Sequence, residues 1–215
     1  IQLFTGVGRS CDFDVFGRDH LMNRLVYVRD NETGAFWNIN WEPVRRAFDM
    51  YRCTHGLGYT TIQTEVDGIC ADMRIFVPSG RDPVELWTIR LRNASNQERS
   101  LSLFTYNQFQ FKYKWGFDSY GDMIFRGVDF NREANALIAS KHPFRRPHHY
   151  LLGFMTSDRW IDGFDGSRDA FVGNYTTLAD PQGVVEGRCS NTPGSSEASI
   201  GALHIAIELK PAEEP

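Results

Sequence analysis

The sequence predicts an all-β fold, a large antiparallel β-sandwich, from three observations. Short runs rich in β-branched and aromatic residues recur along the chain and are bounded by turn residues. Apolar and polar residues alternate within several of these runs, as they do in strands that bury one face. No segment shows a sustained apolar period of about 3.6 residues, the signature of an amphipathic helix. Many short strands joined by turns are typical of a sandwich.

The first expected hairpin joins residues 25–30 (LVYVRD) to residues 35–41 (AFWNINW). Residues 31–34 (NETG) lie between these two runs and have the chemistry of a turn. Residues 42–51 follow, and they are the one candidate for a short helix because Pro43 suits a first helical turn.

The second expected hairpin turns at Asp67-Gly68, a pair that favours the positive φ values of a type I′ turn. Residues 59–66 before the turn and residues 69–77 after it both alternate between apolar and polar side chains. Each strand is therefore expected to bury one face.

The third expected hairpin pairs residues 84–93 with residues 100–111 around the polar turn at 94–99. In its first strand, Trp87 and Ile89 face opposite to the neighbouring arginines. Further strands are expected at residues 136–140, 150–156 and 203–209.

Length and charge limit the classes of protein that the chain can represent. Its 215 residues suffice for one core, so a single domain over residues 1–215 is expected. The net charge of -4 gives no basic surface for nucleic acid, and no apolar run approaches the roughly 20 residues that cross a membrane. The four cysteines show no close pairing or metal-ligand spacing, which favours free thiols and a cytoplasmic location.

The segment of residues 160–175, WIDGFDGSRDAFVGNY, is unusually dense in charge, glycine and aromatic residues. We expect Asp165, Arg168 and Asp169 to form a structural polar cluster in which carboxylates pair with the guanidinium. The alternative is that Arg168 and an aspartate hold an oxygen-rich ligand such as a sugar. A hydrolase that uses the acidic residues of this segment is a further hypothesis.

Other motifs predict no metal or cofactor site. His142, His148 and His149 are separated by prolines, and adjacent histidines on an extended chain point to opposite faces. Cys53 and His55 are two residues apart on an expected strand, so contact between them is possible but unspecific.

A long connection at residues 112–125, KYKWGFDSYGDMIF, is rich in aromatic and charged residues, and loops of this size are usually functional. Trp115 and Tyr120 are suited to stacking on a pyranose ring, and Asp118 and Arg126 are suited to hydrogen bonds with hydroxyl groups. We interpret these four residues as candidate substrate-binding residues, with ordinary packing of the aromatic side chains as the alternative.

A series of short motifs runs along the chain in a fixed order. They are Tyr27-Val28-Arg29-Asp30, Phe36-Trp37, His55-Gly56-Leu57-Gly58-Tyr59, Phe76-Val77-Pro78, Gly163-Phe164-Asp165, Arg168-Asp169, Phe171-Val172-Gly173 and Gly187-Arg188-Cys189-Ser190-Asn191. In these motifs and their order, the chain resembles the N-terminal domain of the cellobiose and chitobiose phosphorylases, glycoside hydrolase family 94, over nearly its whole length.

The resemblance implies a galactose-mutarotase-like supersandwich, truncated at both ends. In the family this domain precedes a helical linker, an (α/α)6 barrel and a small β domain. Family members cleave a β-linked disaccharide with inorganic phosphate as co-substrate and give a sugar 1-phosphate with inversion. The general acid belongs to the barrel, so this fragment alone is expected to have no catalytic residue and no activity.

The resemblance further implies a homodimer in the full-length protein, and it places the segment at residues 112–126 nearest the acceptor sugar. The sequence does not identify the disaccharide. It also leaves open whether this segment contacts the sugar or only the partner subunit. The alternative function is a free-standing carbohydrate-binding module.

Overall fold

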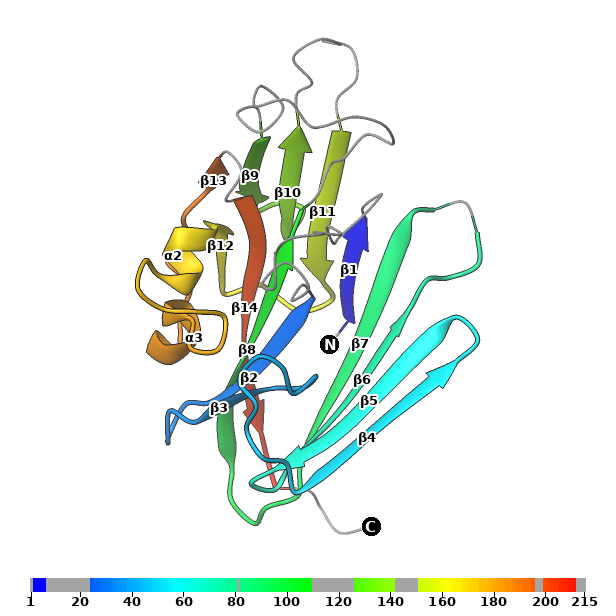
Figure 1. Cartoon of the computed structure of the whole chain (residues 1–215), viewed down its shortest axis with the longest axis vertical. Coiled ribbons are helices and arrows are strands. Elements are labelled where there is room, and N and C mark those ends of the chain that lie inside the picture. Colours follow the sequence, from blue (N-terminus) through cyan, green and yellow to red (C-terminus); the bar gives the residue numbers. More distant parts are fainter. Residues whose placement is uncertain are drawn as a thin grey trace.

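Two antiparallel sheets face each other in the computed structural model, which describes residues 2–6, 24–80, 82–109, 126–141, 151–195 and 199–211 (Figure 1). The larger sheet has nine strands in the order β13-β9-β10-β11-β1-β7-β6-β5-β4. Its strands are β1 (Gln2–Gly6), β4 (Met50–Gly56), β5 (Tyr59–Val66), β6 (Ile69–Phe76), β7 (Val84–Asn93), β9 (Arg126–Asn131), β10 (Ala136–Lys141), β11 (Leu151–Ser157) and β13 (Gly194–Ser195).

The smaller sheet has five strands in the order β12-β14-β8-β2-β3. Its strands are β2 (Leu25–Asp30), β3 (Phe36–Asn38), β8 (Arg99–Gln108), β12 (Gly163–Ser167) and β14 (Ser199–Leu209). Two short helices, α2 (Arg168–Val172) and α3 (Gln182–Glu186), lie beside this sheet on the left of Figure 1. The predicted all-β sandwich is therefore confirmed. No helix in the part of the chain that the structure describes is long and apolar enough to cross a membrane.

Two of the three predicted hairpins are confirmed. Strands β2 and β3 pair with Val28 opposite Trp37. Strands β5 and β6 pair with Val66 opposite Ile69, and the turn between them has φ values of 50° at Asp67 and 76° at Gly68. These positive values are the ones that a type I′ turn requires, so the Asp-Gly pair sets the register of the hairpin.

The third predicted hairpin is wrong, because its two strands belong to different sheets. Strand β7 pairs with β1 and β6, whereas β8 pairs with β2 and β14. The connection at residues 94–98 thus crosses from one sheet to the other. Asn93 holds this crossing in place, because its side-chain amide donates to the carbonyl oxygens of Gln97 at 2.6 Å and of Leu209 at 3.2 Å.

The predicted short helix at residues 42–51 is also wrong. Trp41 and Arg45 have φ values of 68° and 57°, which a right-handed helix does not allow. The segment forms a turn at residues 42–44, has no regular structure at residues 45–48, bends at Asp49 and enters β4 at Met50. The helices lie instead at α2 and α3, and each has five residues, too few to show an apolar period in the sequence.

Strand β8 separates the two parts of the apolar core. Leu101 and Leu103 point into the main core between the two sheets. Phe104 and Tyr106 point to the other side, where they contact Phe171 of α2 at centroid distances of 6.4 and 6.1 Å. The helices therefore cover the outer face of the smaller sheet, and β8 is buried on both faces.

Candidate functional site

Asp165 anchors the segment at residues 190–192. Its side chain is completely buried in β12. The backbone N–H of Ser190 donates to both carboxylate oxygens at 3.1 Å, and Oδ1 also accepts from the Ser190 hydroxyl at 2.6 Å and from the Thr192 N–H at 3.1 Å. Burial and the charge of Asp165 raise the pKa of the neighbouring Cys189 thiol well above its ordinary value. Asp165 therefore has a structural role as a hydrogen-bond acceptor.

Arg168 contacts a residue other than Asp165. It is the first residue of α2, is half-buried, and interacts with the hydroxyl group of Tyr106 on β8. Burial raises the pKa of that hydroxyl, while the charge and hydrogen bond of Arg168 oppose the rise. Asp169 is exposed. The structure shows no hydrogen bond or ion pair among Asp165, Arg168 and Asp169 within the described residues, so the polar cluster that they were expected to form stays a prediction.

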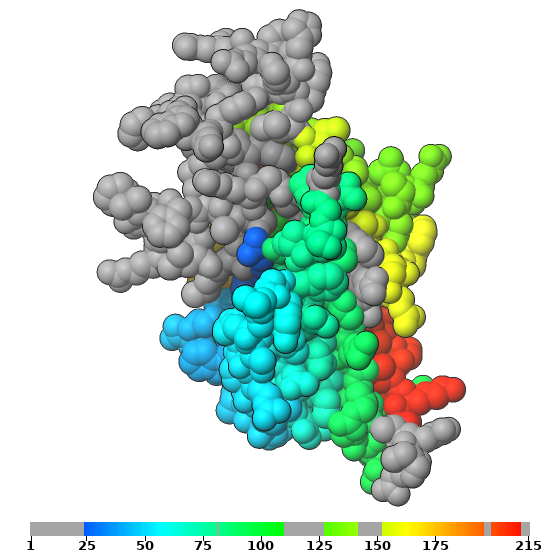
Figure 2. All heavy atoms as spheres, turned by 90° about the vertical axis from the view of Figure 1, so that its right-hand side faces the viewer, coloured from blue at the N-terminus to red at the C-terminus, as the bar shows by residue number. Residues whose placement is uncertain are grey.

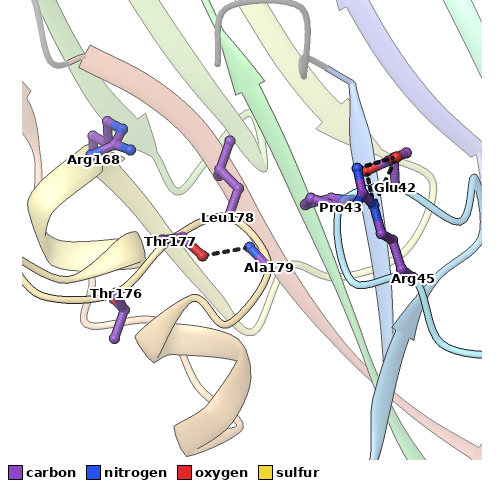
Figure 3. A pocket seen from close by; sticks show the side chains of 8 residues that line it. All are labelled: Glu42, Pro43, Arg45, Arg168, Thr176, Thr177, Leu178 and Ala179. Carbon is purple, nitrogen blue, oxygen red and sulfur yellow. Dashed lines mark hydrogen bonds and ion pairs between the residues drawn. The ribbon is translucent and has the colours of Figure 1, made fainter. Parts of the chain in front are cut away.

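Arg168 instead lines a pocket of about 480 Å³ between two loops, together with Glu42, Pro43, Arg45, Thr176, Thr177, Leu178 and Ala179. One loop joins β3 to β4, and the other joins α2 to α3. Figure 3 shows Arg168 on one wall, Glu42 and Arg45 on the opposite wall, and Leu178 between them. The volume is within the range of small-molecule sites.

An ion pair neutralises one wall of the pocket. Arg45 Nε donates to the two carboxylate oxygens of Glu42 at 2.9 and 3.0 Å. The Arg45 guanidinium also lies 5.9 Å from the ring centroid of Trp41, so that the turn, the ion pair and the ring form one unit.

Internal hydrogen bonds order the opposite wall. The Thr176 hydroxyl donates to the Val172 carbonyl oxygen. The Thr177 hydroxyl donates to Asp180 Oδ1 at 2.6 Å and accepts from the Ala179 N–H at 3.1 Å. The pocket walls are therefore built before any ligand arrives.

The four candidate substrate-binding residues stay a prediction. Trp115, Asp118 and Tyr120 lie outside the described residues, and Arg126 is described only as the first residue of β9, opposite Lys141 of β10. The histidine segment at residues 142–149 also lies outside the described residues.

Of the other sequence candidates, Asp162 is exposed and its Oδ2 accepts from the Ala206 N–H at 2.7 Å. Within the described ranges, no group of three or more His, Cys, Asp and Glu side chains is placed to hold a metal ion.

Cys53 and His55 are in contact on the exposed strand β4. Cys53 Sγ lies 3.6 Å from His55 Nε2, and His55 Nδ1 lies 3.0 Å from the Thr60 hydroxyl. If the Thr60 oxygen accepts from Nδ1–H, Nε2 has its lone pair facing the thiol. The structure thus shows the contact that the sequence left open.

A pair of packed antiparallel sheets with short covering helices defines this chain as a β-sandwich domain of the supersandwich class. The chain belongs to glycoside hydrolase family 94, since the model of that family's supersandwich domain matches residues 21–215.

Several curated relatives of the chain are named as phosphorylases. It is 38% identical over 192 residues to solabiose phosphorylase of Paenibacillus borealis, a match that covers 89% of this chain and 25% of the relative. It is 33% identical over 193 residues to N,N'-diacetylchitobiose phosphorylase of Vibrio furnissii, covering 88% of this chain and 24% of the relative. It is 29% identical to 3-O-beta-D-glucopyranosyl-beta-D-glucuronide phosphorylase of Paenibacillus borealis over 98% of this chain and 27% of the relative. The chain thus spans about a quarter of the length of these relatives.

Proposed function

We propose that this chain is the N-terminal domain of an inverting glycoside phosphorylase that converts a β-linked disaccharide and inorganic phosphate to a sugar 1-phosphate. The observation that carries the proposal is the family match over residues 21–215, combined with relatives named as disaccharide phosphorylases. Within such an enzyme the domain supports the catalytic barrel and makes a dimer contact.

The chemistry of such an enzyme requires one protein acid, because phosphate takes the place of the attacking water of an inverting hydrolase. That acid must reach the leaving oxygen in its protonated form. Two described carboxylates are already engaged, since Asp165 accepts four hydrogen bonds from Ser190 and Thr192 and Glu42 of the pocket is ion-paired with Arg45. This supports an accessory role for the domain, with the acid supplied by the barrel, and no activity for the 215 residues alone.

The acceptor-sugar side is the place where this domain contributes to specificity. Trp115 and Tyr120 cover a sugar face, and Asp118 and Arg126 exchange charge-assisted hydrogen bonds with its hydroxyl groups. In the full-length enzyme, Trp115→Ala and Asp118→Ala raise the KM for the acceptor in the synthetic direction and leave the KM for the sugar 1-phosphate nearly unchanged. If both constants rise together, the segment has a structural role and contacts no acceptor.

A homodimer and a cytoplasmic location complete the proposal. Strand β4 ends the larger sheet, and all seven of its residues are exposed, as the cyan surface in Figure 2 shows. An exposed sheet edge of this length is usually covered in a native protein, which supports a subunit or domain contact. Cys53, Cys70 and Cys189 are free thiols, as a reducing compartment favours.

The decisive experiment is a phosphorolysis assay of the full-length protein with phosphate and a panel of β-linked disaccharides. We expect release of a sugar 1-phosphate of α configuration from one of them, and no release by residues 1–215 alone. Disaccharide binding by residues 1–215, without any phosphorolysis by the full-length protein, would instead identify a carbohydrate-binding module.

A further inference from the structure

Arg168 has a half-buried charge that no carboxylate neutralises within the described residues. Asp165 accepts hydrogen bonds from Ser190 and Thr192, and Asp169 is exposed. The partner of Arg168 is the neutral Tyr106 hydroxyl. A guanidinium removed from water is normally paired with an anion, and its planar fork suits carboxylate and phosphate oxygens.

The charges of the described residues that line the pocket sum to one positive charge. Arg45 and Glu42 neutralise each other on one wall, which leaves the charge of Arg168 on the other. Figure 3 shows that the pair and Arg168 stand on opposite sides, and no interaction joins them in that view. An incoming anion would therefore meet Arg168 without having to break the Glu42–Arg45 pair.

The remaining lining groups suit a ligand that also has hydroxyl groups. The Thr176 and Thr177 hydroxyls donate their own hydrogens to Val172 and Asp180, and the Thr177 oxygen already accepts from the Ala179 N–H. A hydroxyl oxygen has two lone pairs, so each oxygen retains capacity to accept a hydrogen bond from a ligand. Leu178 and Pro43 add apolar surface, which the C–H face of a sugar can cover. The volume of about 480 Å³ exceeds what a bare ion needs and accommodates a monosaccharide unit.

We propose that this pocket binds an oxyanion, carried by free phosphate or by an anionic sugar, with the anionic group on Arg168. The oxyanion part rests on the pocket alone, whereas the sugar part rests on the proposed function. Anion binding in this pocket does not involve the atoms that react in phosphorolysis, so it can be measured in the absence of turnover. Its failure is therefore distinct from failure of the phosphorolysis assay.

The test is calorimetric titration of the protein with inorganic phosphate, glucose 1-phosphate and glucuronate at constant ionic strength, with neutral glucose as the control ligand. We expect saturable binding of at least one of the three anions and none of glucose. Binding of phosphate alone identifies the free ion as the ligand, and tighter binding of glucose 1-phosphate or glucuronate identifies an anionic sugar.

Two variants place the binding in the pocket. Arg168→Lys keeps the charge but loses the two-pronged donor, so affinity falls several-fold. Ala179→Glu adds a carboxylate to the wall beside Arg168, and affinity falls about tenfold or more, because the new charge competes with the ligand.

Ala134→Glu, in the exposed turn between β9 and β10, adds the same charge away from the pocket and leaves affinity unchanged. Because Ala179 lies in a loop, its variant tests the site even if Arg168→Lys does not fold. The proposal is overturned if no anion binds to the wild-type protein, if glucose binds as well as the anions, or if Ala179→Glu binds as tightly as Ala134→Glu.

Discussion

Tyr27 and Leu178 are joined by a buried hydrogen bond that spans 151 residues of sequence, in which the tyrosine hydroxyl donates to the leucine carbonyl oxygen at 2.8 Å. This bond attaches the loop between α2 and α3, which forms one wall of the pocket, to strand β2 of the smaller sheet. The ring of Tyr27 also lies 6.3 Å from that of Phe171 in an edge-on arrangement. Tyr27 of the smaller sheet thus holds this pocket wall in position.

Loss of this bond should destabilise the protein. Tyr27→Phe keeps the ring and leaves the buried carbonyl of Leu178 without its donor, so the free energy of unfolding falls by about 1–3 kcal/mol. Urea denaturation measures the change. Tyr175→Phe is the matched control, since the Tyr175 side chain is fully exposed, at 101%. Equal stability of the two variants would show that the Tyr27 bond contributes nothing.

The stability of the protein should decrease in mild acid because of His204. Burial lowers the pKa of His204, nearby Arg29 lowers it further, and Asp162 opposes the shift. The ring stacks on Phe104 at 4.5 Å and its Nε2 lies 3.0 Å from the Ser102 hydroxyl. Below the ordinary pKa of about 6.5, the unfolded chain binds a proton that the folded chain does not, so stability is lost as the pH falls toward the folded-state pKa.

Thermal melts between neutral pH and pH 5 measure this loss. His204→Gln should show a smaller decrease than the wild-type protein, although its stability at neutral pH is lower. His55→Gln, a change on the exposed strand β4, should follow the wild-type profile. A wild-type profile and a His204→Gln profile of the same slope would contradict the assignment.

Asp165 and Asp169 should differ sharply in their effect on stability although they are four residues apart. Asp165→Ala removes the acceptor of the Ser190 and Thr192 N–H groups and costs about 2–3 kcal/mol. Asp169→Ala changes an exposed side chain and stays within about 0.5 kcal/mol of the wild-type protein. Chemical denaturation of both variants measures the two changes in the free energy of unfolding. If the two aspartates belong to the single polar cluster that the sequence predicted, both variants should be strongly destabilised.

The three cysteines that the structure describes should react with iodoacetamide in the order Cys53, Cys70, Cys189. Cys53 is exposed and faces His55, which can accept its proton. Burial raises the pKa of Cys70, and burial with the charge of Asp165 raises that of Cys189 well above the ordinary value. Mass spectrometry of partly labelled protein gives the order, and His55→Ala should slow labelling of Cys53 alone. Early labelling of Cys189 would mean that the Asp165 contact opens readily.

The local structure of most strands was predictable, because alternation depends on neighbours within one run. The sheet to which a strand belongs was not. Strand β8 has suitable residues for a hairpin with β7, but its partners β2 and β14 come from distant parts of the chain. Nothing in the sequence of the turn at residues 94–98 distinguishes a hairpin from a crossing between sheets. The crossing involves a hydrogen bond from the side-chain amide of Asn93 to the carbonyl oxygen of Leu209, 116 residues away, which no local pattern reveals.

The pocket was unpredictable for a related reason. Arg168 is a candidate because its segment, residues 160–175, is dense in charged residues. The sequence predicted that adjacent aspartates would be its partners. The structure places Arg168 across the pocket from Glu42 and Arg45. Those two residues lie in a loop that the sequence predicted as a helix. Spacing along the chain could not reveal that Ser167 ends a strand and that the next residue starts a helix. The two loops meet only because both sheets and both helices are in place.

The position of β14 determines when the smaller sheet can form during synthesis. This strand comes last among the described strands, yet it lies between β8 and β12 and pairs with both. A ribosome that has not released residues 199–209 therefore holds a nascent chain in which β8 and β12 each have an open edge. Such edges pair readily with other chains, and long-range strand pairing is slow. The nascent protein must stay protected from its neighbours until residues 199–209 have been made.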